Sequence, residues 1–179
     1  MGTFLVGSDS GLYRVTPSNN VLPLWVNGRV DQILNLEFPS SDGTIKPAWL
    51  LRTDKGIFVT YDLEVFEERN NGLSFLTIKK YKDKEKTLEK QIQELKDVCA
   101  NPLNNNELVT ATKDNVCYSN NAGQTWKNIS SMSKATPGVK SVAIATLDGE
   151  TVVFENESQL SVIKDSAFYN CDSLTYEKS

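Results

Sequence analysis

Short apolar runs alternate with polar turns along the chain, and four stretches have the same layout. In each, a short apolar run meets a polar turn, and a second run of alternating polarity leaves it. The four stretches are FLVGSDSGLYRVTPSNN from Phe4, WLLRTDKGIFVTYDLEV from Trp49, LVTATKDNVCYSNNAGQTW from Leu108 and VVFENESQLSVIKDSAF from Val152. Alternation over about four to eight residues between turn signals predicts half-buried β-strands.

The turns of these stretches are SDSG, TDKG, TKDN and ENES. The first apolar residues after them are spaced by 45, 59 and 44 residues: Leu12, Ile57, Val116 and Leu160. Gly11, Gly56 and Asn115 are residue types that accept the positive φ of tight hairpins. A repeat of about 45 residues built from short strands predicts four-stranded antiparallel blades of a β-propeller.

We therefore expect an all-β chain of about four blades, with approximate bounds 4–28, 29–80, 96–132 and 139–179. The strands expected in the last three are 32–38, 49–52, 56–61, 65–68, then 98–100, 108–112, 116–119, 125–129, then 141–146, 151–155, 160–164 and 174–176. The first blade begins directly at Phe4 and lacks its innermost strand.

Ring closure removes the exposed strand edges of a propeller, so an incomplete blade needs a partner. Residues 1–179 are expected to be a single propeller, whole or partial. Any further blades would lie on the same longer chain, on another chain, or on a second copy.

The 59-residue interval contains one insertion, KDKEKTLEKQIQELKD, from Lys82 to Asp97. It is rich in Lys, Glu, Gln and Leu and holds no Gly or Pro, which is helical composition. Leu88, Ile92 and Leu95 fall at i, i+4 and i+7 and form one apolar stripe. The sequence predicts a charged helix over segment 81–97, either solvated on the propeller rim or docked on a partner.

The stretch SNNAGQTW resembles the Asp-box, S-x-D-x-G-x-T-W, of BNR-type β-propellers. The matching residues are Ser119, Gly123, Thr125 and Trp126, with Asn121 in the place of the Asp. Asp62 and Asp165 fall in the same column of neighbouring blades, without the Gly and Trp. The resemblance implies a propeller of the sialidase, sortilin or photosystem II assembly-factor-like type, and as a motif it extends over Leu108 to Ile129.

The chemistry of this motif is that of a turn fastening. The side-chain oxygen of Asn121 can accept hydrogen bonds from the backbone of its own turn, and Ser119 can add a hydroxyl bond. Gly123 allows φ > 0, and Trp126 buries a large face between hairpins. Nothing in this set activates a nucleophile, so we expect structural residues here and no catalytic residue.

The absence of His removes Ser-His-Asp catalysis, Cys-His catalysis and imidazole metal ligation. Cys99, Cys117 and Cys171 show no C-x-x-C spacing. Neither a metal site nor a disulfide framework nor another cofactor is therefore expected. The odd cysteine count favours a reducing, cytoplasmic compartment, whereas a secretory or surface origin stays open if the chain is a fragment.

The net charge of −4 and the pI near 5.0 provide no broad attraction for nucleic acid or anionic lipid. No apolar run approaches the ~20 residues of a membrane span, and the start of the chain does not have the pattern of a signal peptide.

The resemblance implies that a sialidase-type enzyme would need an arginine cluster, a Tyr nucleophile assisted by Glu, and an Asp acid/base. The arginines available are Arg14, Arg29, Arg52 and Arg69, and YRVTP departs from the R-I-P opening of that family. The sequence favours a non-catalytic module that recognises a protein, peptide or glycan through its loop faces. The alternatives are a sialidase-type glycoside hydrolase and a structural subunit of a larger assembly, such as a phage tail or surface complex.

Overall fold

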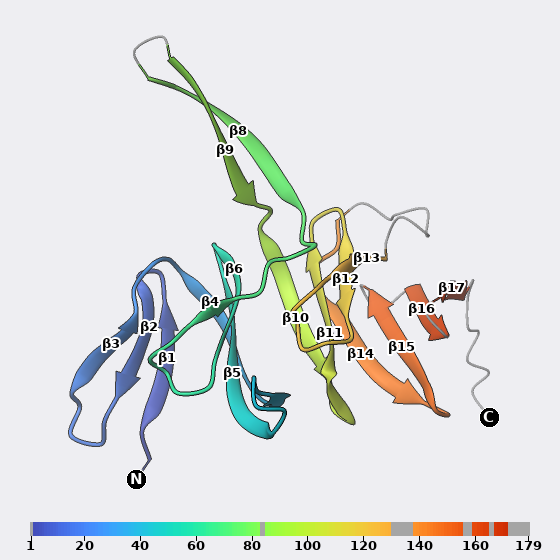
Figure 1. Cartoon of the computed structure of the whole chain (residues 1–179), viewed down its shortest axis with the longest axis horizontal. Coiled ribbons are helices and arrows are strands. Elements are labelled where there is room, and N and C mark those ends of the chain that lie inside the picture. The colour runs from blue at the N-terminus through green and yellow to red at the C-terminus, as the bar shows by residue number, and fades with distance from the viewer. Residues whose placement is uncertain (1, 83–84, 130–137, 156–158, 165–166, 172–179) are drawn as a thin grey trace. The chain divides into compact units, whose positions relative to one another are not determined.

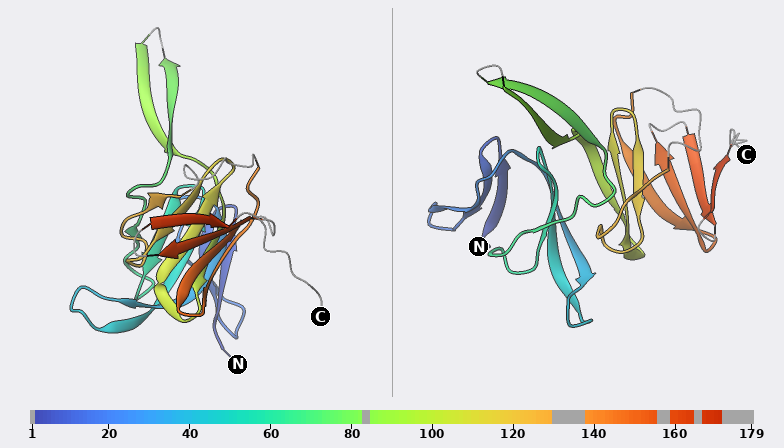
Figure 2. Two further views of the ribbon diagram at one scale, coloured as in Figure 1. Left: turned by 90° about the vertical axis from the view of Figure 1, so that its right-hand side faces the viewer. Right: turned by 45° about the horizontal axis from the view of Figure 1, so that its top comes forward.

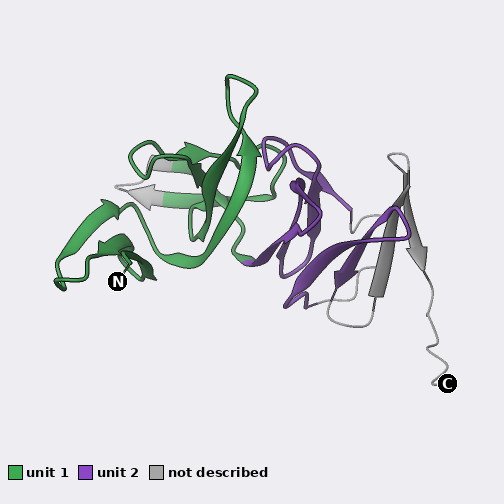
Figure 3. Cartoon of the chain, turned by 90° about the horizontal axis from the view of Figure 1, so that it is seen from below, with its two compact units in different colours: residues 1–95 green, residues 96–179 purple. Residues whose placement is uncertain are grey.

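The computed structural model consists of β-sheets and describes residues 2–82, 85–129, 138–155, 159–164 and 167–171 (Figure 1). These residues contain no helix, which confirms the all-β prediction. It follows that no helix in this part of the chain could cross a membrane. The chain divides into two compact units, Met1–Leu95 (unit 1) and Lys96–Ser179 (unit 2) (Figure 3).

Unit 1 contains three sheets. The first, in the order β1-β2-β3, comprises β1 (Phe4–Ser8), β2 (Gly11–Val15) and β3 (Val21–Trp25). The second, in the order β4-β5-β6-β7, comprises β4 (Val30–Pro39), β5 (Ile45–Thr53), β6 (Gly56–Thr60) and β7 (Glu67–Glu68). The third is a two-stranded hairpin of β8 (Phe75–Lys82) and β9 (Glu85–Ile92).

Unit 2 contains two four-stranded sheets, in the orders β10-β11-β12-β13 and β14-β15-β16-β17. The first comprises β10 (Leu95–Asn101), β11 (Asn104–Thr112), β12 (Val116–Ser119) and β13 (Lys127–Asn128). The second comprises β14 (Val142–Leu147), β15 (Glu150–Glu155), β16 (Gln159–Lys164) and β17 (Ala167–Cys171).

Every strand expected in the second and third blades overlaps an observed strand, and β12 has the predicted bounds. The first sheet has three strands, in keeping with the missing strand noted at Phe4. In the last sheet, β14, β15 and β16 overlap the expected strands. The expected strand 174–176 lies outside the described residues, and β17 was not predicted.

Three hairpins close with the same side-chain bond. The hydroxyl oxygen of Ser8, Thr53 or Thr112 accepts a hydrogen bond from the backbone N–H two residues further on, at 3.2, 3.0 and 3.3 Å. These bonds are local Ser/Thr turns, which hold the backbone without help from the rest of the fold.

The glycines of two of these turns have the expected positive φ, 148° at Gly11 and 105° at Gly56. An added Cβ at Gly56 would lie 2.1 Å from Oδ1 of Asn70, an amide oxygen that accepts the backbone N–H of Ile57. Asn115, the third residue of a type that accepts a positive φ, does not adopt one.

Each unit buries a core between two of its sheets. In unit 1, Leu12 and Trp25 of the first sheet pack with Val30 and Leu51 of the second. The rings of Trp25 and Phe58 lie 5.1 Å apart between centroids. In unit 2 the core joins sheet β10–β13 to sheet β14–β17 and includes Val109, Ala111, Val116, Tyr118, Ile129, Val142, Ile144 and Val153.

The predicted helix at about 82–97 is wrong. Residues 75–82 and 85–92 form eight antiparallel cross-strand pairs, from Phe75↔Ile92 to Lys82↔Glu85. Both views of Figure 2 draw these residues as a β-hairpin. The spacing of Leu88 and Ile92 is four, an even number, so it keeps them on one face of a strand as well as of a helix. The preceding run FLTIKKYK supplies a β-favouring partner, and pairing overrides helical composition.

A designed disulfide tests this hairpin. We expect Lys79→Cys/Leu88→Cys to oxidise more readily than a pair on opposite faces, because these residues are direct cross-strand partners whose side chains lie on one face. The measurement is mass spectrometry of the linked proteolytic peptides. Lys79→Cys/Glu89→Cys is the matched control, since neighbouring strand residues point to opposite faces. Equal cross-linking of both variants, or of neither, would contradict the hairpin.

Candidate functional site

The turn Ser119–Trp126 is held by side-chain bonds to its own backbone. Oδ1 of Asn121 accepts the hydroxyl of Ser119 at 2.9 Å and the backbone N–H of Thr125 at 3.0 Å. Nδ2 of Asn121 donates to Oγ1 of Thr125 at 2.8 Å. The hydroxyl oxygen of Ser119 in turn accepts the backbone N–H of Gly123 at 2.9 Å. Both polar ends of the Asn121 amide are therefore engaged within the turn.

Two consecutive residues of this turn adopt left-handed backbone conformations, Ala122 with φ 57° and Gly123 with φ 81°. The first is unusual for a residue with a Cβ and costs about 1–3 kcal/mol where it occurs. It is held by a bond from the Ala122 N–H to the carbonyl of Asn106, at 2.9 Å. Ala122 and Asn106 were not predicted from the sequence, because neither a plain Ala nor a distant carbonyl has a recognisable signal.

Packing holds the same turn from beneath. Trp126 is buried, and a Cβ added at Gly123 would lie 3.2 Å from its ring. Ser119, from the end of β12, is also buried. All five residues of the predicted Asp-box thus lie in one turn, and their polar groups bond within that turn.

Asp62 forms a comparable turn at the end of β6. Its Oδ1 accepts the backbone N–H groups of Glu64 and Val65, at 2.8 and 2.9 Å, and the hydroxyl of Thr60. These donors, that of Val65 first, hold the pKa of Asp62 below its ordinary value. Leu63, the residue after Asp62, has φ 63°. It is therefore left-handed, like Ala122, the residue after Asn121. Asp165 lies outside the described residues.

The Trp column of the Asp62 turn is displaced by a single residue. Cross-strand partners Val59↔Glu67 and Tyr118↔Lys127 show that Phe66 precedes β7 as Trp126 precedes β13. Phe66 lies six positions after Thr60, whereas Trp126 lies seven positions after Ser119. An aromatic residue therefore does follow Asp62, and a one-residue deletion hid it from a rigid alignment. Phe66 packs against the core of unit 1.

A second polar cluster joins the two sheets of unit 2 through Glu107. Its Oε1 accepts the phenol of Tyr118 at 2.8 Å and the hydroxyl of Thr151 at 2.7 Å. Its Oε2 accepts the amide of Asn101 at 2.8 Å, and that amide also donates to Oγ1 of Thr146. This network satisfies buried polar groups at a sheet-to-sheet contact.

Tyr118 and Glu107 are the residue types that a sialidase-like nucleophile would require. Burial, together with the hydrogen bond to Glu107, raises the pKa of Tyr118 well above its ordinary value. A raised pKa disfavours the phenolate and is the opposite of nucleophile activation. Unit 2 also contains no arginine, so no guanidinium of that unit could hold a substrate carboxylate.

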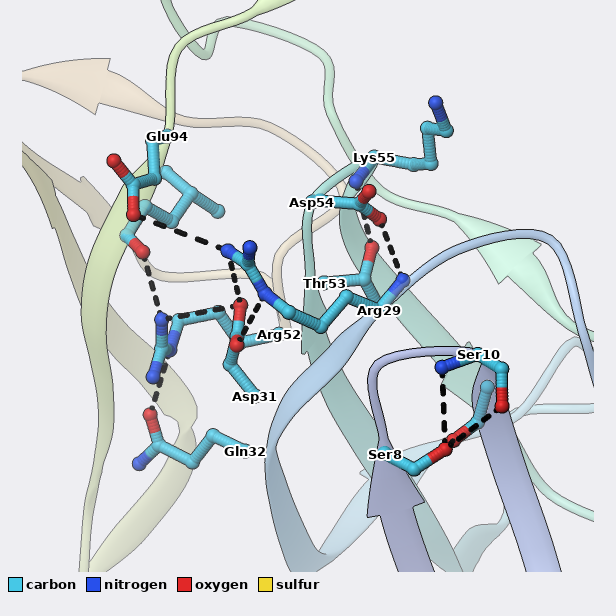
Figure 4. Close-up of polar contacts among 12 residues, drawn as sticks. Ser8, Ser10, Arg29, Asp31, Gln32, Arg52, Thr53, Asp54, Lys55 and Glu94 are labelled. Carbon is cyan, nitrogen blue, oxygen red and sulfur yellow. Dashed lines mark hydrogen bonds and ion pairs between the residues drawn. The ribbon is translucent and has the colours of Figure 1, made fainter.

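Two of the four arginines meet in unit 1, where each contacts an acid (Figure 4). Arg29 forms bonds of 2.7 and 3.2 Å with the two carboxylate oxygens of Asp31, and these interactions raise its pKa. Arg52 lies 3.8 Å from the same carboxylate and donates to Gln32 and to the carbonyl of Leu95. Both guanidinium groups are therefore engaged by side chains of β4, and that of Arg52 also by the carbonyl of Leu95.

Arg69 is buried and likewise engaged. It pairs with Glu67 at 2.9 Å, donates to the phenol of Tyr61 at 3.3 Å, and lies over the ring of Phe38. Three of the four arginines therefore have structural partners, and none of the three is available as a carboxylate clamp.

An open pocket of about 520 Å³ lies in unit 1 between the β8–β9 hairpin and the second sheet. From the sheet it is lined by Asp54, Lys55, Glu68 and Asn70, and from the hairpin by Phe75, Lys80, Glu89, Lys90, Gln91 and Ile92. Its charges are mixed, three lysines and three carboxylates, so it has no clear preference for an ion of either sign.

Within the described residues, no three Cys, Asp or Glu side chains lie close enough together to hold a metal ion. Cys99 and Cys117 are free thiols. Burial raises the pKa of Cys117 to about 11, which makes it a poor nucleophile.

No protein-family model matches this chain, and no curated protein matches it either. The resemblance of SNNAGQTW to an Asp-box therefore stays a prediction based on its residues.

Replacing Asn121 tests whether this turn is a fastening. We expect Asn121→Ala to lower the free energy of unfolding by about 1–3 kcal/mol, because it leaves the buried Ser119 hydroxyl without its acceptor. Asn121→Asp keeps an oxygen acceptor at that position, so we expect it to lower the free energy of unfolding less than Asn121→Ala does. The measurement is thermal unfolding, in which about 2–4 °C corresponds to each kcal/mol. Gln124→Ala, in the same turn, is the control; a loss equal to that of Asn121→Ala would sink the assignment.

Proposed function

We propose that this chain is a non-catalytic β-propeller module, whole or partial, that binds a protein, peptide or glycan or serves in an assembly. The observation that carries the proposal is the Glu107 network. The Tyr and Glu that hydrolysis would need are bound to each other and to Thr151 on the neighbouring sheet. Tyr118 is buried and the raised pKa of its phenol disfavours the phenolate, so the Glu107 network serves the contact between the two sheets.

The reading of the sheets as blades is supported by their shared construction. Three four-stranded sheets and one three-stranded sheet each keep their strands in chain order. Three hairpins share one hydroxyl-to-backbone bond, and two turns share an Asn or Asp that accepts backbone N–H groups. Repeats of this kind bury their faces only against neighbours, and they present loops for recognition.

Exposed apolar side chains at strand ends and loops support a role in binding. Phe4, Val65, Leu88 and Leu103 are each more than 60% exposed. Single exposed apolar residues are ordinary, but here several accompany sheet edges, where pairing groups are also exposed.

The glycosidase alternative gives the sharpest test. The purified chain at high concentration should release no fluorophore from a panel of fluorogenic sialosides above the rate without protein. The positive arm uses glycan arrays and random peptide libraries as probes, and saturable binding that persists in Tyr118→Phe is expected. If the chain hydrolyses sialosides and Tyr118→Phe abolishes that activity, the proposal of a non-catalytic module is wrong and the chain is a glycosidase.

A further inference from the structure

The β8–β9 hairpin has one face that contains cations and no described carboxylate. From the register, this face, here called the hairpin face, holds Phe75, Thr77, Lys79, Leu88, Lys90 and Ile92. The described acid of the hairpin, Glu89, lies on the opposite face and pairs there with Lys80 at 2.5 Å. Lys79 and Lys90 are exposed, as are Phe75 and Leu88 at 48% and 62%. The hairpin face therefore combines positive charge with exposed apolar surface.

The charge of the hairpin opposes that of the rest of the chain. Residues 75–92 contain six lysines and three acidic residues, a net charge of +3. The remaining residues contain 13 basic and 20 acidic side chains, a net charge of −7. The rest of the chain therefore has a net charge complementary to that of the hairpin face.

A matching acidic surface lies at the edge of the second sheet. It consists of Asp62, Glu64, Glu67 and Glu68, here called the acidic edge, with Val65 62% exposed among them. All four acids are exposed, and β7 is the last strand in its sheet. Glu67 pairs with Arg69, and Asp62 accepts backbone bonds. Glu64 and Glu68 form no ion pair with any described residue.

The two surfaces do not neutralise each other within one chain. Glu68 and Lys90 line the same open pocket but form no ion pair there. A two-stranded hairpin by itself is marginally stable in water, and exposed strand edges invite pairing with another chain. Lys79 and Leu88 of the hairpin face and Glu64 and Val65 of the acidic edge do not line this pocket and are exposed, so these groups are available to a partner.

We propose that the hairpin face of one copy docks on the acidic edge of a second copy, so that the chain self-associates. The inference deepens the assembly role proposed above and rests on it. Both surfaces belong to unit 1, so every copy carries both, and a two-fold pair satisfies the contact reciprocally. Val65 supplies the apolar contact for Phe75 and Leu88, and the lysines face Glu64 and Glu68.

The test is sedimentation equilibrium of the full chain across a concentration series at low and high salt. We expect a dimer that weakens with salt. Lys79→Glu/Lys90→Glu should raise the dimer Kd at least about tenfold, and Glu64→Lys/Glu68→Lys should do the same. Combining all four substitutions in one chain should restore association, because the charges are again complementary. Lys113→Glu/Lys127→Glu, an equal charge change at exposed positions of unit 2, should leave the Kd unchanged.

Three outcomes would overturn the proposal. The wild-type chain stays monomeric, the hairpin variant dimerises with the same Kd as the unit 2 control, or the variant with all four substitutions does not regain association. Far-UV circular dichroism of each variant establishes that it is folded. A duplex DNA of about 20 base pairs is the second probe, and lysine-dependent DNA binding by a monomer would assign the hairpin face to nucleic acid instead. The sedimentation results do not depend on the sialoside assay. Failure of self-association and failure of the proposed non-catalytic function can therefore be told apart.

Discussion

Short polar side chains that bond to their own turn are the interaction on which this structure depends. Two of its strands, β7 and β13, have two residues each, too few for pairing alone to fix their position. The hydroxyls of Ser8, Thr53 and Thr112 close the hairpins, while Asn121 and Asp62 close the turns that lead into those two short strands. With the turns held, the sheets can present one face to a neighbour, and the cores of both units form between sheets.

Polar side chains that were candidates for catalysis also form structural contacts. Three such contacts lie among the described residues: Glu107 binds Tyr118, Asp31 binds Arg29, and Arg69 binds Glu67. The described groups that form no ion pair include Lys79 and Lys90 of the hairpin and Glu64 and Glu68 of the acidic edge, all of them exposed. Such groups are suited to association, in which charge sets specificity and rate, more than to the desolvated site that bond cleavage needs.

The strands and turns were largely predictable, because alternation, turn residues and spacing act over a few neighbouring residues. The hairpin was not: the spacing of Leu88 and Ile92 suits a helix and a strand equally, and only the pairing with Phe75 and its neighbours decides between them. Phe66 was hidden by one deleted residue, and the bonds of Glu107 join residues as much as 44 positions apart, beyond any local pattern. The turn around Asn121 was predicted down to its acceptor atom, since its chemistry is contained within eight residues.

Hydrogen exchange at the turn Ser119–Trp126 tests the central claim most directly. Thr125 is exposed, so its amide would exchange rapidly if it belonged to an open loop. Because its N–H donates to Asn121, and that of Gly123 to Ser119, the account predicts that both amides exchange as slowly as the paired amides of β11 and β12. Exchange of these two amides at the rate of an unprotected loop, while the strands stay protected, would contradict it.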